Sequence, residues 1–292
     1  MSLRYLLIGI ALFYLVFAPG PATAAHTIEA GKVKAPPTID GIDNEATWRD
    51  ARSFTIRDER LGVDIHLKAA YTDDSIFFLV RFPDQTEDRL HKPWVWNKAL
   101  EVYEIGPQRE DTFTFKWNMA DGTVDLSNFS DDDYTADVWY WKANRTDPAG
   151  FADDKMHILS SEAAKKSNSL VSAKGRQRYL LRLGDKGAAA QKKRILTDYQ
   201  GDVQDQFTSQ TPDGSRGDIR AKGAWSKGEW TVEFARKLQT GHDDDVQFDA
   251  SPGKSYLFGI SIAGLYGEDV DPSKPHPYGQ GRISDPLYLK FR

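Results

Sequence analysis

The sequence contains no cysteine, and this absence excludes several kinds of site. Disulfide bonds, cysteine-ligated zinc, iron–sulfur clusters and haem attached through a C-x-x-C-H motif all need the thiol. Any bound metal must therefore be held by His, Met, Lys, Tyr or carboxylate side chains. Without disulfides, the 292-residue chain needs a sizeable hydrophobic core to be stable.

Long apolar runs are also scarce, and the clearest one lies at the N-terminus. It covers residues 6–17, follows the basic Arg4 and precedes Ala22-Thr23-Ala24, which fits an A-x-A cleavage site. The run is shorter than the roughly 20 residues that a membrane span requires. We therefore expect residues 1–24 to be a signal peptide. The mature chain is predicted to be periplasmic or secreted, with no membrane span after cleavage.

The chain has no large excess of charge of one sign. It contains 38 basic and 43 acidic residues, with a net charge of −5, spread along its length. This pattern predicts no nucleic-acid partner. The sequence also lacks G-x-S-x-G, H-E-x-x-H, P-loop and dinucleotide-binding motifs, so no catalytic residues are predicted from these motifs.

Short alternating segments dominate the chain and predict β-strands. Residues 63–71 alternate between apolar and polar, residues 72–75 form a turn, and residues 76–82 return as the second strand of a hairpin. Many such strands separated by Asp, Gly and Pro turns predict an all-β fold, an antiparallel β-sandwich. Further strands are expected at 100–105, 112–117, 229–236, 256–262 and 286–291.

Two segments depart from this pattern. Glu45 to Trp48 reads as one helical turn, and we expect it to close one end of the sandwich with its tryptophan. Residues 160–217 are lysine-rich and polar, so we predict a long polar insertion of loops with one short helix around 188–196. No repeat or second core is evident, and we expect residues 25–292 to form a single domain.

The stretch 137–154 contains the most distinctive aromatic pattern. Alternation along its first residues places Trp139 and Trp141 on one face of a strand. The strand is followed by turns at Asp147-Pro148 and at Gly150. Two large aromatic side chains beside a polar turn suggest an apolar surface bordered by polar residues. Such a surface is compatible both with a hydrophobic core and with the wall of a ligand pocket.

Candidate metal ligands are few. Asp131-Asp132-Asp133 and Asp243-Asp244-Asp245 offer clustered oxygens of the kind calcium prefers, although neither has the alternating spacing of a known calcium loop. Acidic turns of this type are most often simply solvated. Met119 ends the strand predicted at 112–117, and a thioether is one of the ligands available to non-covalent haem.

The histidines give weaker signals. His91 precedes the aromatic segment Trp94-Val-Trp96, and His276 lies between two prolines shortly before the last strand. His242 stands in a Thr-Gly-His-Asp turn, where we expect a surface position. For each histidine, a role other than metal ligation is the more common one.

Six sequence blocks together resemble a known family. They are residues 37–48, 110–117, 137–154, 214–219, 230–238 and 256–260. With them the chain, from about residue 28 to 291, resembles the ethylbenzene dehydrogenase-related haem-binding domain. This is the γ-subunit type that accompanies periplasmic molybdenum enzymes of the DMSO reductase family. The opening Ile39-Asp-Gly to Trp48 is shared with family-nine carbohydrate-binding modules, so the fold implied is carbohydrate-binding-module-like or DOMON-like.

The resemblance implies a function without bond-making chemistry. The expected protein binds one b-type haem non-covalently and relays electrons to or from a redox partner or a molybdoenzyme-type catalytic subunit. Trp139 and Trp141 would form one side of the haem cleft. Lys142 and Arg145 would pair with the haem propionates.

The resemblance also implies axial ligands. The γ-subunits use a methionine and a lysine, and Met119 is the methionine nearest to the family position. Where the family has its lysine, this chain has Gly281-Arg282, and arginine stays protonated and cannot bind iron. Lys274 and His276 lie in the same segment; we favour His276 as the second ligand, because neutral imidazole binds haem iron readily, with His91 in reserve.

Two other functions remain open from the sequence. A carbohydrate-binding module of the same fold would use exposed tryptophans such as Trp94 and Trp96 to stack on sugars, with calcium as a structural ion. A sensor or scaffold domain would carry no cofactor. Fold alone does not decide between them.

Overall fold

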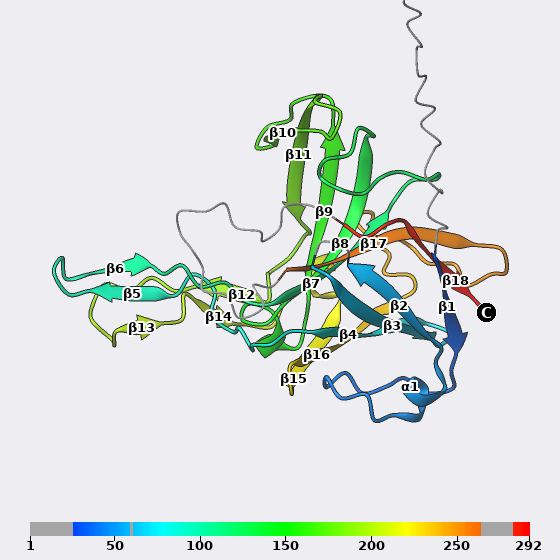
Figure 1. Ribbon diagram of the computed structural model, residues 1–292, viewed down its shortest axis with the longest axis horizontal. Helices are drawn as coiled ribbons and strands as arrows, with labels where there is room; N and C mark the ends of the chain where they lie inside the picture. Colours follow the sequence, from blue (N-terminus) through cyan, green and yellow to red (C-terminus); the bar gives the residue numbers. More distant parts are fainter. Residues whose placement is uncertain (1–25, 59–60, 264–282) are drawn as a thin grey trace, which may run out of the picture.

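The computed structural model describes residues 26–58, 61–263 and 283–292. The predicted signal peptide and His276 lie outside these residues. In the described part, one short α-helix and two single 3-10 turns accompany a set of β-strands (Figure 1). The elements are β1 (His26–Lys32), α1 (Ala46–Asp50), β2 (Ser53–Asp58), β3 (Val63–Tyr71), β4 (Ser75–Pro83), β5 (Trp94–Asn97), β6 (Val102–Ile105), β7 (Thr112–Asn118), β8 (Tyr134–Lys142), η1 (Asp147–Ala149), β9 (Asp153–Ser160), β10 (Asn168–Val171), β11 (Gln177–Gly184), β12 (Gln191–Lys193), β13 (Val203–Gln204), β14 (Phe207–Ser209), η2 (Ser215–Gly217), β15 (Arg220–Ser226), β16 (Glu229–Lys237), β17 (Ser255–Ala263) and β18 (Leu287–Phe291).

Two large sheets make up the sandwich, and strand β1 belongs to both. Sheet 1 has the order β10-β11-β9-β8-β7-β17-β18-β1, and sheet 2 has the order β1-β3-β4-β16-β15 with β2 also paired to β3. Residues 26–30 of β1 pair with β18, and residues 31–32 pair with β3. Both pairings of β1 are parallel, whereas the other strand pairs are antiparallel. The predicted all-β, antiparallel sandwich is confirmed.

Aromatic side chains from the two facing sheets form the core. The ring of Phe115 on β7 lies 4.8 Å from Phe78 of β4 and 5.2 Å from Phe234 of β16. Next to them, Trp117 stacks on Phe258 of β17 at 4.5 Å. Because aromatic contacts of this kind contribute about 0.5–1.5 kcal/mol each beyond their buried area, this cluster is a main source of stability in a chain without disulfides.

The outer faces of both sheets are also covered. On sheet 1, Leu126 from the segment between β7 and β8 packs on a second apolar cluster that includes Val138 and Leu180. On sheet 2, Trp48 of α1 is fully buried against Ala70 and Leu79. The helical turn was therefore predicted in the right place but with the wrong role: it covers a sheet face and does not close an end of the sandwich.

The segment 160–217 differs from the loops and short helix that the sequence predicted. Strands β10 and β11 extend sheet 1, and residues 191–193 form strand β12, which pairs with β14. Strand β13 joins β5 and β6 in a small three-stranded sheet, which projects from the sandwich as an arm (Figure 1). The expected helix around 188–196 is wrong, because backbone pairing with residues 207–209 holds this stretch extended.

In the described ranges, no helix has the length and apolar character needed to cross a membrane.

Candidate cofactor site

Strand β8 lies between β7 and β9, and its two faces have different surroundings. Trp139 and Trp141 point into the core, and both are fully buried. Trp139 packs against Trp117 at 5.3 Å, and Trp141 packs against Trp230 at 4.9 Å. The prediction that Trp139 and Trp141 share one face of the strand is confirmed. Neither indole lines the two cavities described below, so a direct contact with a cofactor stays a prediction.

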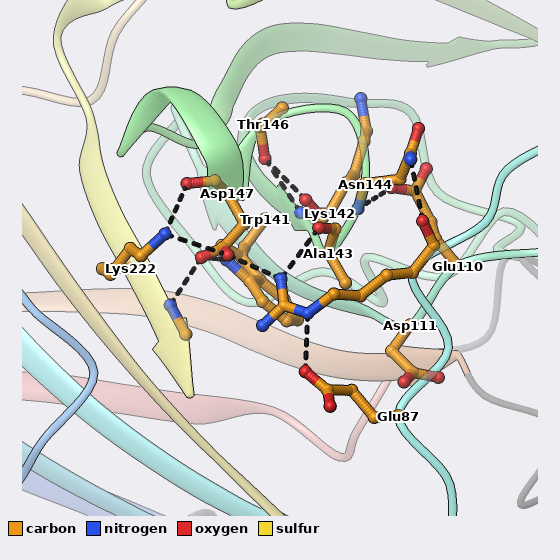
Figure 2. A network of polar contacts seen from close by, with 12 residues as sticks. Glu87, Glu110, Asp111, Trp141, Lys142, Ala143, Asn144, Thr146, Asp147 and Lys222 are labelled. Atoms are coloured by element: carbon orange, nitrogen blue, oxygen red, sulfur yellow. Dashed lines mark hydrogen bonds and ion pairs between the residues drawn. The ribbon is translucent and has the colours of Figure 1, made fainter. Parts of the chain in front are cut away.

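The buried carboxylate of Asp147 connects the turn after β8 to the rest of the sandwich. Its Oδ1 accepts hydrogen bonds from Trp141 Nε1 at 3.0 Å and from the Gly223 backbone N–H at 2.6 Å. Its Oδ2 contacts Arg89 Nη1 at 2.8 Å and Lys222 Nζ at 3.2 Å. Figure 2 shows Asp147 between Trp141 and Lys222, so this acidic residue ties sheet 1 to β15.

Lys142 and Arg145, the predicted propionate partners, already have carboxylate partners in the protein. Lys142 Nζ lies 2.5 Å from Asp153 Oδ2, and both residues are buried. Burial lowers the pKa of Lys142 to about 7, in spite of this contact. Burial alone would raise the pKa of Asp153, but Lys142 and Lys155 hold it below its ordinary value. Arg145 forms an ion pair with the fully buried Glu110.

His91 belongs to the same group of side chains. Its Nδ1 lies 3.2 Å from Glu110 Oε1, and its ring centroid lies 6.0 Å from that of Phe207. Burial, with the nearby charge of Arg145, lowers the pKa of His91 to about 2. The imidazole is therefore neutral at ordinary pH, which is the form that binds a metal.

Met119 lies at the opposite end of β7 from this group. Thr112 pairs with Lys142 at one end of β7, and Met119 follows Asn118 at the other. Seven residues of extended chain separate them, which corresponds to roughly 20 Å. The structure therefore does not bring Met119 and His91 together, and His91 as a reserve ligand stays a prediction. His276 lies outside the described residues.

Met119 lines a cavity of about 900 Å³ at the end of β7. The wall combines apolar side chains such as Val246 and Leu257 with the rings of Tyr256 and Tyr288. It also includes polar groups, among them Asn118, Asp121, Gln239, Asp243, Asp245, Gln247, Asp249 and Lys254. A second cavity of about 700 Å³ shares Thr123 and Leu257 with the first. Val124, Leu126, Phe129, Ile283 and other side chains line it.

His242 lines the Met119 cavity as well, which the sequence did not suggest. Its Nδ1 lies 2.7 Å from Asp218 Oδ2, so Nε2 is the ring nitrogen that remains for a ligand. The hydrogen bond with Asp218 raises the pKa of His242. The prediction of a surface position holds only in part, because the side chain is 40% exposed. In the sequence, the feature that could have pointed to a role for His242 is its position shortly after the block 230–238, which carries part of the family resemblance.

The donor set of this cavity fits a haem iron. A thioether and an imidazole with a carboxylate on its other nitrogen are established axial ligands, and cysteine is not needed. The cavity volume lies in the range of ligand and cofactor sites. Of the metal ligands predicted from the sequence, only Met119 lies on this cavity among the described residues.

Comparison with known proteins identifies one family. A family model described as ethylbenzene dehydrogenase matches residues 46–262. Among curated proteins, no significant match is found.

Among solved structures, the matches have low similarity to this chain. A family 9 carbohydrate-binding module from Caldicellulosiruptor kristjanssonii in complex with glucose has a TM-score of 0.42 and 11% identity, covering 91% of this chain and 95% of that one. A putative carbohydrate-binding protein from Bacteroides uniformis has a TM-score of 0.41 and 8% identity, covering 92% and 100%. These scores are too low to transfer a binding property to this chain.

Proposed function

The chain belongs to the ethylbenzene dehydrogenase family, and from this membership we propose that it is a non-catalytic haem-binding domain that relays electrons. It binds one haem b non-covalently and exchanges electrons with a molybdoenzyme-type catalytic subunit or another redox partner. The apolar run at residues 6–17, followed by an A-x-A site, supports a periplasmic location.

The observation that carries this proposal is the cavity that Met119 and His242 share. Haem bound there would supply one-electron redox chemistry, and Met119 and His242 are the residues that would hold its iron. Asp218 orients the imidazole of His242 through Nδ1. Lys254, on the wall of the same cavity, offers a cation for a propionate. His276 is the competing second ligand.

The absorbance spectrum of the full-length protein reconstituted with haem tests the proposal. We expect stoichiometric uptake, a Soret band and low-spin bands that sharpen on reduction. Met119→Ala removes the thioether, so it should shift the reduction potential and change the spin state. Met156→Ala, on β9 and outside the cavity, is the matched control and should leave the spectrum unchanged.

The second ligand is identified by comparing His242→Ala with His276→Ala. The substitution that converts the haem spectrum to high spin identifies the histidine that binds the iron. Protein that takes up no stoichiometric haem contradicts the proposed function.

A second candidate function rests on the arm. Trp96 contacts Tyr103 at 5.0 Å and Tyr199 at 5.2 Å, and Tyr199 is 57% exposed. Partly exposed aromatic clusters of this type stack on sugar rings. If haem is not bound and a polysaccharide is retained by the wild type but not by Trp96→Ala, carbohydrate binding is the function.

A further inference from the structure

Four buried aspartates meet inside the sandwich. Asp137 on β8 and Asp154 on β9 are fully buried, and Asp245 and Asp185 are nearly so. Trp139 is the cross-strand neighbour of Asp154, so Asp137, two residues earlier, lies on the same face of sheet 1. Asp185 follows β11, and its backbone N–H donates to the Asp154 carbonyl at 3.3 Å. Asp245 reaches the group from the segment between β16 and β17.

The carboxylate oxygens of this group converge. One oxygen from each of Asp137, Asp154 and Asp245 lies within 4.8 Å of the other two. Oxygens that bind one Ca²⁺ at about 2.4 Å can be separated by at most about 4.8 Å. The three side chains are therefore already close enough to bind a single ion.

The buried oxygens also lack hydrogen-bond donors. Within the described part of the chain, no N–H or hydroxyl group donates to either oxygen of Asp154 or to Oδ1 of Asp137. The other oxygen of Asp137 is saturated, because Trp139 Nε1, the Val246 backbone N–H and Arg236 Nη1 donate to it at 3.1, 3.0 and 2.7 Å. Buried carboxylates in this state either hold a proton or coordinate a cation.

The charge in the group favours a cation. Arg236 is the nearby guanidinium; it pairs with Asp137 and lies 3.7 Å from Asp245. It also stacks on Trp139 and Phe248, at 4.7 and 5.2 Å, which fixes its position beside the Asp137 carboxylate. One guanidinium faces four carboxylates, so a divalent ion would bring the group close to neutrality.

We propose that Asp137, Asp154 and Asp245, with Asp185 beside them, bind one Ca²⁺ ion. The donors are oxygens only and come from two strands, from the residue after β11 and from a loop, which suits the six to eight flexible oxygen contacts of Ca²⁺ better than the tetrahedral N/S set of Zn²⁺. The ion cross-links β8, β9 and the β16–β17 segment, whose Val246 and His242 line the cavity described above. The site needs no haem.

Terbium luminescence and thermal unfolding test the site on the full-length, haem-free protein after treatment with EGTA. Trp139 donates to Asp137, so excitation of tryptophan should sensitise Tb³⁺ bound there, and Ca²⁺ should displace it. Ca²⁺ should raise Tm progressively with its free concentration, because it binds only the folded chain. Mg²⁺ should raise it less.

Asp154→Asn should weaken Ca²⁺ binding by at least about tenfold, since it removes a charged ligand worth about 1.4 kcal/mol or more. Asp243→Asn is the matched control: it removes the same charge from an exposed position two residues from Asp245 and should change the affinity less than twofold. If Asp154→Asn fails to fold, the wild-type titration decides alone. If the wild type takes up no Ca²⁺ and has the same Tm in Ca²⁺ and in EGTA, the proposal is overturned. The buried aspartates are then kept neutral by protons.

Discussion

At the scale of single residues, Asp111 and Asp84 show how burial changes a carboxyl group. Both are almost completely buried, and with Asp88 their oxygens lie within 4.8 Å of one another. Asp111 Oδ2 accepts hydrogen bonds from Trp230 Nε1 at 2.9 Å and from the Asp88 backbone N–H at 2.8 Å. Burial, together with the charge of Asp84, raises the pKa of Asp111 to about 9.

This shift predicts a pH dependence of stability. The pKa is higher in the folded chain than the ordinary value near 3.9, so between about pH 4 and pH 9 the folded state binds the extra proton. The contribution of Asp111 is therefore complete below about pH 4 and is lost as the pH rises towards 9. Asp111→Asn keeps a neutral acceptor for both donors and removes the proton. The wild type should lose stability relative to this variant by up to about 1.4 kcal/mol per pH unit across that window.

Urea unfolding of the two proteins at pH 5, 7 and 9 measures the difference. Asp121→Asn, at an exposed position, controls for the change in charge. A difference between wild type and Asp111→Asn that does not vary with pH would mean that Asp111 is ionised throughout.

At the scale of elements, strand β15 approaches β8 closely across the sandwich. A Cβ atom at Gly223 would overlap the Cζ2 atom of the Trp141 ring, and the core indole cannot move without displacing Trp230. The glycine is therefore required by packing, and its backbone N–H also donates to Asp147.

Gly223→Ala should destabilise the protein by about 1–3 kcal/mol, the usual cost of overpacking a core. Gly31→Ala is the control on another strand, because the nearest atoms to its added Cβ belong to the flexible side chain of Arg292, at 3.7 Å or more. Urea unfolding with tryptophan fluorescence measures both changes. Equal stability of the two variants would show that the Trp141 side of the core is loosely packed.

The elements also show which parts of the fold the sequence could predict. Strands β3, β4, β7, β16, β17 and β18 were predicted because one or both of their faces are apolar and turns bound them. Strands β12 and β13 were missed because their residues are largely polar and exposed. Their partners β14 and β5 are also set by tertiary pairing, and β5 is about a hundred residues away from β13.

The candidate sites divide in the same way. Met119 was predicted as a ligand because it ends the strand in which the resembling family has its methionine, and this role stays a prediction. The link between Met119 and His242, and the meeting of Asp137, Asp154, Asp185 and Asp245, come from segments far apart in the chain. No local pattern contains such distances, so only the folded arrangement reveals these groups.

At the scale of the whole molecule, β1 and β18 hold the two sheets together. Leu289 of β18 is fully buried and pairs with Ile28 on one side and Tyr256 on the other. Because β1 continues from this pairing into sheet 2, damage at Leu289 reaches both sheets.

Leu289→Asp should therefore unfold the sandwich as one unit, since an unpaired charge buried in the core costs several kcal/mol. Lys290→Gln, at the exposed next position, should change stability by less than about 0.5 kcal/mol. Circular dichroism follows the sheets and tryptophan fluorescence follows the core during urea unfolding. Two separate transitions in either variant would contradict the view that β1 and β18 couple the sheets.

The pairing of β1 with β18 also fixes when this protein can become compact. During synthesis, His26–Lys32 leaves the ribosome long before its partner strand Leu287–Phe291. The middle of the sandwich cannot close until this later strand has emerged, and contacts between such distant residues form slowly. Throughout that interval the apolar faces of β1 and β3 are open to other chains, so assistance from a holding chaperone should matter more for this fold than for one built from neighbouring hairpins.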